Sequence, residues 1–237
     1  MKILFSAPSP DDFINLLRAW RFWVLAALIG TLAGAALYLI NPPQYRARAT
    51  VVVSFNMEKS WPNKPDNELF YYLERESRKV EAVAWADATL QQVSAETGLT
   101  VLALRSGKLE LSQPQDGGWH FYAYDPSADL SRKLASTWAR AFTAQIQHAI
   151  QTAVALDAAR KTLETNPADP QYLTMVSELE AGSLAITPEL QVSLAQGKDL
   201  PVTRASGLGT YAFAGAGFSL AFSAFLALFF IHSEHKG

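Results

Sequence analysis

Apolar residues concentrate in two long runs near the ends of the chain, separated by a stretch of mixed polarity. The first run is Phe22–Ile40 and the second is Ala205–Ile231, and neither contains a charged side chain. An apolar helix needs about 20 residues to cross the hydrocarbon core of a bilayer. Both runs satisfy this requirement, so we predict transmembrane helices over residues 21–41 and 207–231.

Each run has an alternative interpretation that its composition disfavours. The first could be a cleaved signal peptide, but the apolar region of such a peptide is usually only about 7–15 residues long. The second could be a buried helix of a soluble protein, but it has no polar face and is rich in phenylalanine. These phenylalanines are Phe218, Phe222, Phe225, Phe229 and Phe230.

Basic residues beside the two runs predict the orientation of the chain. Lys2, Arg18 and Arg21 precede the first run, and Lys236 follows the second. Short segments that carry Lys and Arg stay in the cytoplasm. We therefore expect both termini to be cytoplasmic and the middle of the chain to be translocated.

This orientation divides the chain into five segments. They are a cytoplasmic amphipathic N-terminal segment (1–20), the first transmembrane helix (21–41), an extracytoplasmic α+β domain (42–206), the second transmembrane helix (207–231) and a cytoplasmic tail (232–237). Apolar residues at helical spacing between Phe13 and Trp20 predict that the N-terminal segment lies on the inner leaflet. The alternative for that segment is an early start of the first transmembrane helix.

Alternation of apolar and polar side chains predicts the strands of the central domain. It occurs over residues 45–53, 108–112, 119–124 and 190–195. The second and third strands are expected to form a hairpin around residues 114–118. The first and last strands each adjoin a predicted membrane helix, so we expect them to pair in one small mixed sheet.

Helical spacing predicts one long helix over residues 129–164, where apolar residues recur every fourth position. This stripe consists of Leu130, Leu134, Trp138, Phe142, Ile146, Ile150 and Val154. Residues 67–96 are expected to form one or two helices that end at Gly98, and residues 171–185 another helix. The predicted fold class is α+β, with two transmembrane helices flanking a domain that has a small mixed sheet and one long helix.

The charge and cysteine content narrow the possible functions. The chain has 20 basic and 22 acidic residues, a formal net charge of -2, and no cysteine. A disulfide scaffold, a thiol nucleophile and a thiolate zinc site are excluded, and the charge balance does not favour a nucleic-acid partner.

Motifs for catalysis are also missing from the sequence. The four histidines have no metal-ligand spacing. Gly207–Ala212 matches the Gly-x-Gly-x-x-Ala dinucleotide fingerprint, but it opens an apolar run instead of following a strand. The acidic pairs Glu74/Glu76 and Glu178/Glu180 are typical of a solvated helix surface. We therefore expect no catalytic residue, cofactor or metal, and a protein that is not an enzyme.

Small residues within the two apolar runs predict close helix packing. The first run contains Gly30-x-x-x-Gly34. The second contains small residues at four-residue spacing, namely Gly215, Ser219, Ser223 and Ala227. Such residues let helix backbones approach each other in a membrane. The packing could occur within one chain or between subunits.

The order of these features resembles the polysaccharide co-polymerase (Wzz, chain-length determinant) family. The first apolar run is followed by a strand that opens Pro43-Gln-Tyr45-Arg-Ala47, and the lead Asp12–Trp23 is similar to that of the family. The family usually has a proline-rich stretch before the second transmembrane helix. This chain has only Pro188 and Pro201 there.

The resemblance implies a non-catalytic homo-oligomer in the bacterial cytoplasmic (inner) membrane. Several copies would act with a polysaccharide polymerase or exporter to set the length of a surface glycan, and a separate cytoplasmic tyrosine kinase is a further conceivable partner. Two alternatives stay open: an accessory subunit of another membrane complex, and a membrane-anchored sensor that acts through a partner. Trp61, Trp119 and Tyr122 could stack on sugar rings, although core packing is the favoured interpretation.

Overall fold

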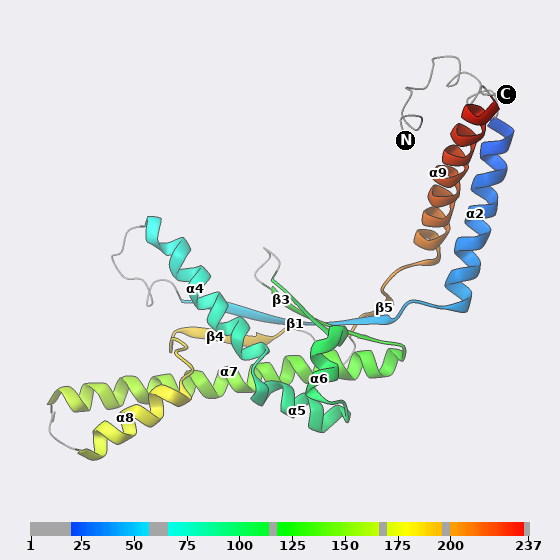
Figure 1. Ribbon diagram of the computed structural model, residues 1–237. Helices are drawn as coiled ribbons and strands as arrows, with labels where there is room; N and C mark the ends of the chain where they lie inside the picture. Colours follow the sequence, from blue (N-terminus) through cyan, green and yellow to red (C-terminus); the bar gives the residue numbers. More distant parts are fainter. Residues whose placement is uncertain (1–19, 57–65, 114–117, 166–169, 196–199, 235–237) are drawn as a thin grey trace. The chain divides into compact units, whose positions relative to one another are not determined.

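The computed structural model describes residues 20–56, 66–113, 118–165, 170–195 and 200–234 (Figure 1). The chain forms two compact units, one made of Met1–Pro43 with Arg204–Gly237 and the other of Gln44–Thr203. The predicted amphipathic segment over residues 1–20 lies outside the described residues except for Trp20.

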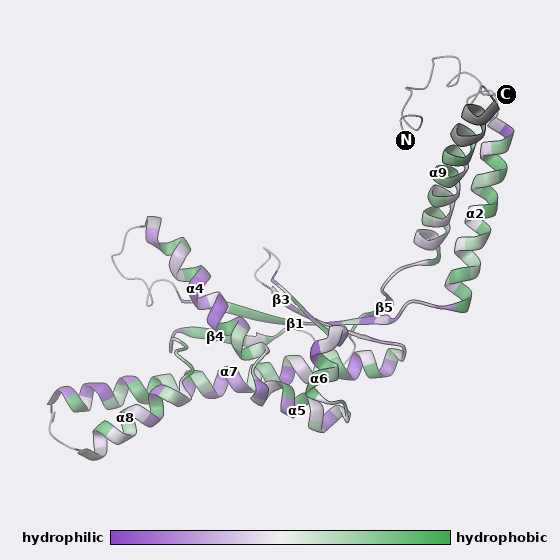
Figure 2. Cartoon of the chain, in the orientation of Figure 1, coloured by the Kyte–Doolittle hydropathy of each residue, from purple (hydrophilic) through white to green (hydrophobic). Residues whose placement is uncertain are grey.

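The first unit contains two apolar helices, α2 and α9, that lie side by side (Figure 1). Helix α2 covers Trp20–Ile40 and helix α9 covers Leu208–Glu234. Both are long and apolar enough to cross a membrane. Figure 2 shows mostly hydrophobic residues on α2 and on the coloured part of α9. Their bounds lie within three residues of the predicted helices over 21–41 and 207–231.

The second unit is built on a five-stranded sheet with the order β2-β3-β1-β4, in which β5 also pairs with β1. The strands are β1 (Tyr45–Phe55), β2 (Leu109–Ser112), β3 (Gly118–Asp125), β4 (Leu190–Leu194) and β5 (Val202–Arg204). The fold class is therefore α+β, as predicted. Strand β5 follows Pro201 and has too few residues to give an alternating pattern.

Pairing of the first and last predicted strands is confirmed, but the expectation of a mixed sheet is wrong. Strand β1 pairs antiparallel with β4, with Val53 opposite Val192, and antiparallel with β3, with Ala47 opposite Ala123. The short β2–β3 connection also gives an antiparallel pair. Because β3 and β4 both run opposite to the strand between them, the sheet is antiparallel.

Helix α7 (Ala128–Thr165) covers one face of this sheet and confirms the predicted long helix. The middle of the predicted stripe is fully buried, namely Leu134, Trp138, Phe142 and Ile146. Val154 is instead 53% exposed. A four-residue step turns about 400° around a helix, so such a row drifts by about 40° at each step. The buried face continues through Ala149, Ala153 and Leu156.

The remaining helices of the second unit are shorter than α7. They are α4 (Asp66–Ala84), α5 (Asp87–Thr97), α6 (Val101–Ala103) with the π-helical turn η1 (Leu104–Lys108), and α8 (Pro170–Gly182). Gly98 ends α5 with a left-handed φ of 75°, as the sequence predicts. Helix α8 ends before the predicted residue 185, because Leu184 and Ala185 adopt a positive φ that a right-handed helix does not permit.

Candidate functional site

Helices α2 and α9 contact each other through the glycines that the sequence analysis identified. A Cβ atom added at Gly30 would overlap the carbonyl oxygen of Gly215, and one added at Gly34 would overlap that of Tyr211. A Cβ at Gly215 would lie 3.0 Å from the Cα of Gly34. The two backbones therefore touch, and this contact requires glycine at all three positions.

A hydrogen bond across the same contact adds to the packing. The hydroxyl of Ser219 on α9 donates to the carbonyl oxygen of Ala26 on α2 at 2.8 Å. Ala26, Gly30 and Gly34 form the buried row of α2. Ser223 and Ala227, the other two predicted packing residues, are half-buried on the same side of α9 as Ser219. The structure thus shows the packing within one chain.

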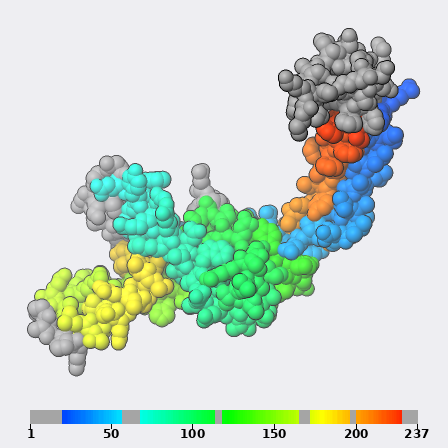
Figure 3. Space-filling view, viewed as in Figure 1, coloured from blue at the N-terminus to red at the C-terminus, as the bar shows by residue number. Residues whose placement is uncertain are grey.

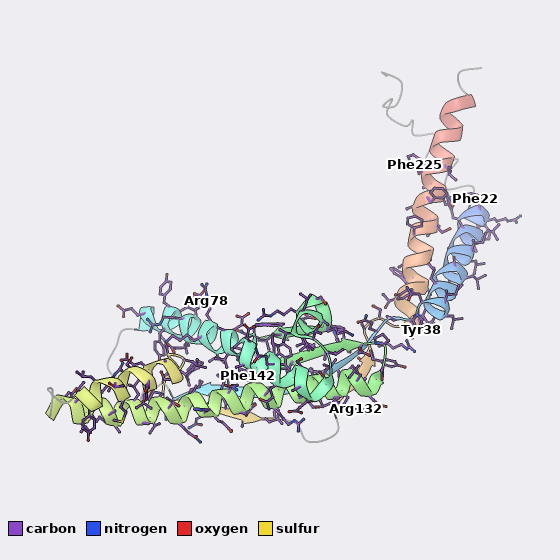
Figure 4. All side chains as sticks on the ribbon, turned by 60° about the horizontal axis from the view of Figure 1, so that its bottom comes forward. Phe22, Tyr38, Arg78, Arg132, Phe142 and Phe225 are labelled. Atoms are coloured by element: carbon purple, nitrogen blue, oxygen red, sulfur yellow. The ribbon has the colours of Figure 1, made fainter. Side chains whose placement is uncertain are left out.

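Aromatic and basic side chains gather at one end of the helix pair. Tyr38 of α2 meets Tyr211 of α9 edge-to-face, with ring centroids 5.5 Å apart; Figure 4 shows Tyr38 at this end. The guanidinium of Arg204 lies 5.8 Å from the centroid of the Tyr38 ring and donates to the carbonyl oxygen of Pro43 at 3.1 Å. This cluster was not predicted from the sequence, although tyrosine at the end of an apolar run is typical of a membrane interface.

An apolar groove of about 620 Å³ runs along the two helices. Its walls combine the small residues of the contact with larger apolar side chains, including Ile29, Ala33, Leu37, Phe218 and Phe222. The space-filling view shows α2 (blue) and α9 (orange) in contact with each other (Figure 3).

The residues of the motif that follows the first apolar run begin the sheet. Ala47 is fully buried in the core of the second unit, and Tyr45 pairs with Asp125 at the start of β1. Pro201 accepts a hydrogen bond from the backbone N–H of Arg48 at 3.3 Å, and Pro188 precedes β4. All of these positions serve to start or align strands.

The face of the sheet opposite α7 carries polar and aromatic side chains, which we call the open face. Side chains alternate between the two faces of a strand, so the inward row Ala47, Ala49, Val51 and Val53 fixes the outward one. The open face consists of Arg46, Arg48, Thr50, Val52, Ser54, Glu110, Ser112, His120, Tyr122 and Tyr124, with Gln191 and Ser193 from β4.

Contacts between neighbouring strands order this open face. The guanidinium of Arg46 lies 5.0 Å from the centroid of the Tyr122 ring. The Tyr124 hydroxyl donates to Glu110, and Thr50 and His120 share a hydrogen bond of 3.0 Å. Burial raises the pKa of the Tyr124 phenol above its ordinary value, and the bond to Glu110 and its charge act in the same direction.

The three aromatic residues considered for sugar stacking have different surroundings. Trp119 is buried and stacks on Phe142, with ring centroids 6.0 Å apart and planes 16° apart, so core packing is its role. Phe142 is labelled on α7 in Figure 4. Tyr122 is half-buried on the open face. Trp61 lies outside the described residues.

Three of the four carboxylates in the acidic pairs are engaged in ion pairs, namely those of Glu74, Glu76 and Glu180. Glu76 is 3% exposed and its carboxylate bonds to Lys79 at 2.8 Å, which the sequence did not predict. Glu74 pairs with Arg78, and Glu180 pairs with Arg160 at 2.7 Å. Among the described residues, no three acidic or histidine side chains are grouped so as to hold a metal ion.

No family model matches this chain, and no curated protein matches it. The fold and the two surfaces described above therefore carry the functional argument.

Proposed function

We propose that this protein is a non-catalytic, homo-oligomeric membrane protein that regulates the chain length or the export of a bacterial surface polysaccharide. The observation that carries the proposal is the order of the elements along the chain and the way in which they pair. Two apolar helices pack through glycines, and between them in the sequence lies one α+β unit whose first strand pairs with its last two. This arrangement of elements is the one expected from the resemblance to the co-polymerase family.

Exposed apolar side chains support a location of α2 and α9 in a membrane. Leu32 is 70% exposed, Phe213 82% and Phe218 76%. Removing apolar surface from water is favourable by about 25 cal/mol per Å², and a bilayer removes it without any other protein. Backbone hydrogen bonds are satisfied within each helix, as hydrocarbon requires. We place α2 and α9 in the inner membrane. The flanking basic residues favour cytoplasmic termini, which puts the sheet domain outside the cytoplasm.

The apolar surface that the helix pair leaves uncovered supports the proposal that several copies assemble. The apolar groove beside Phe218 and Phe222 can receive a neighbouring helix, from a second copy or from a polymerase or exporter. In this account the assembled oligomer acts through binding, and the chemistry of glycan extension belongs to the partner enzyme.

The size distribution of the surface polysaccharide tests this function. It should be compared between the wild-type bacterium, a deletion of this gene, and the deletion complemented with the wild-type copy. We expect the deletion to abolish or broaden the modal length and the complemented strain to recover it. An unchanged distribution with a normal amount of polymer would contradict the proposal and favour an accessory subunit of another complex.

A further inference from the structure

We infer that the open face of the sheet binds an acidic segment of the glycan, with Arg48 and Arg46 holding the acid group. The inference rests on the proposed function and names the class of ligand for the sheet domain. It concerns a surface within one compact unit, so its geometry does not depend on the membrane helices.

Arg48 is the residue that points most directly to a ligand. Its Nε–H is buried and has no hydrogen-bond partner among the described residues. A buried donor without a partner costs about 1–3 kcal/mol, and a bound water or ion is one way in which native proteins satisfy such a group. A guanidinium presents its donors in a planar fork that fits the two oxygens of a carboxylate.

Arg46 places a second positive charge on the same face. It lies two residues before Arg48 on β1, and its guanidinium is held over the Tyr122 ring by a cation–π contact. The nearest carboxylate of the face, Glu110, accepts the hydroxyl of Tyr124. The open face therefore combines two cations, of which Arg46 is held over Tyr122, with one carboxylate that accepts a hydrogen bond. This charge balance is complementary to an acidic ligand.

The neutral side chains around the two arginines suit a polyhydroxylated ligand. Thr50, Ser112, Gln191 and Ser193 offer hydroxyl and amide groups along the face, beside the phenols of Tyr122 and Tyr124. Strand β1 has 11 residues, or about 36 Å at 3.3 Å per residue. This length accommodates several consecutive sugar residues.

Other occupants fit the face less well. A plane of anionic lipid headgroups favours a cluster of about four to eight Lys and Arg side chains, whereas the arginines of this face are Arg46 and Arg48. An interface with a second copy of the chain would need an apolar centre. On this side of β1 the exposed large apolar residue is Val52, which is too little apolar surface for such a centre.

Binding to the full chain in nanodiscs of zwitterionic lipid tests the inference. The acidic probe is hexagalacturonate, and the neutral probe is the same oligomer with its carboxyl groups reduced. Isothermal titration should show binding of the acidic probe alone. We expect Arg48→Gln to weaken binding about tenfold, as loss of a charge-assisted hydrogen bond predicts, and Arg46→Gln to weaken it by a smaller factor.

Arg132→Gln is the matched control, because Arg132 lies on α7 and pairs only with the exposed Asp129 in the structure as described. Its binding should equal that of the wild type. Equal binding of the acidic and neutral probes, or wild-type binding by a normally melting Arg48→Gln protein, would overturn the inference. So would stronger binding to vesicles rich in phosphatidylglycerol, or a change of oligomer mass in Arg48→Gln without loss of probe binding.

This result is separable from the proposed function. If deletion of the gene changes the modal length but the purified protein does not distinguish the two probes, the glycan-binding inference fails alone. If the probes are distinguished but the deletion leaves polysaccharide length unchanged, the length-regulating role fails and the binding face stands.

Discussion

Three glycines set the distance between α2 and α9, and their substitution is the sharpest test of that contact. Gly30→Leu would place a side chain against the backbone of Gly215. Gly217→Leu is the matched control, because an added Cβ at Gly217 has nothing within 4 Å. The chain has no cysteine, so an engineered Ala26→Cys/Ser219→Cys pair reports proximity without background.

We expect Gly30→Leu to reduce disulfide formation by this pair severalfold in native membranes, and Gly217→Leu to leave it unchanged. The pair Leu32→Cys/Ser219→Cys should not cross-link, because Leu32 is 70% exposed on another side of α2. Equal cross-linking in both glycine variants would show that the contact is not the one described.

The hydroxyl of Ser219 should contribute less than the small size of the residue. Ser219→Ala removes the bond to the Ala26 carbonyl, and hydrogen bonds between membrane helices average about 0.6 kcal/mol. Ser219→Leu also inserts bulk into the contact and should separate the helices. The cysteine-free chain, labelled on each helix in turn at introduced cysteines, allows the separation to be measured by energy transfer. A larger effect of Ser219→Ala than of Ser219→Leu would contradict this order.

Tyr124 should titrate above its ordinary value because burial and Glu110 both raise its pKa. A raised pKa in the folded state means that protonated Tyr124 stabilises the fold below about pH 10, and that this contribution is lost as pH rises through the folded pKa. Ultraviolet titration of the wild type minus Tyr124→Phe isolates the group among the 8 tyrosines. Glu110→Gln should lower the pKa; an unchanged value would mean that Glu110 has no influence.

At the scale of elements, α7 is joined to α4 through one buried side chain. Trp138 is fully buried, and its indole N–H donates to the carbonyl oxygen of Ala84 at 2.9 Å. Trp138→Phe should destabilise the sheet domain by about 1–3 kcal/mol because the carbonyl loses its partner. Trp138→Ala should cost about 3–5 kcal/mol through the cavity that it leaves.

Val154→Ala on the same helix is the control, because Val154 is 53% exposed and exposed substitutions usually change stability by less than about 0.5 kcal/mol. Denaturant unfolding of the full chain in detergent, followed by circular dichroism, measures all three variants. If Val154→Ala matched Trp138→Ala, the buried face of α7 would be assigned wrongly.

Periodicity predicted the elements because each buries one face along a regular repeat. The stripe from Leu134 to Ile146 and the alternation of Ala47 to Val53 are both visible in the sequence and both buried. Periodicity does not determine how strands pair, because strand order and direction depend on residues far apart in the sequence. The prediction of a mixed sheet was wrong for that reason. The turn η1 contains Gly107 with a φ of 90°, a local geometry that no hydrophobic pattern indicates.

The contact between α2 and α9 could be predicted in part, because the spacing of small residues also follows the helical repeat. The spacing of Gly30 and Gly34 indicates close packing. Their partners on α9 depend on how the two helices are aligned along their axes, which the structure shows and the sequence does not. The open face was not predicted, because Arg46 and Arg48 look like ordinary strand surface until β3 places Tyr122 and Tyr124 beside them. A buried, unpaired Nε has no signature in sequence at all.

At the scale of the whole molecule, the account depends on one arrangement: α2 and α9 cross the membrane and the sheet domain between them is translocated. The function proposed for the oligomer and the glycan proposed for the open face both require it. Since the chain lacks cysteine, single cysteines can be placed on either side without a competing thiol.

The decisive measurement is labelling of such cysteines in spheroplasts with a membrane-impermeant maleimide. Arg132→Cys reports on α7 of the sheet domain, where loss of an exposed ion pair costs little, and Ser6→Cys reports on the N-terminal segment. The account predicts that Arg132→Cys is labelled in intact spheroplasts and Ser6→Cys only after lysis. Protection of Arg132→Cys until lysis, or labelling of Ser6→Cys before it, would contradict the proposed topology.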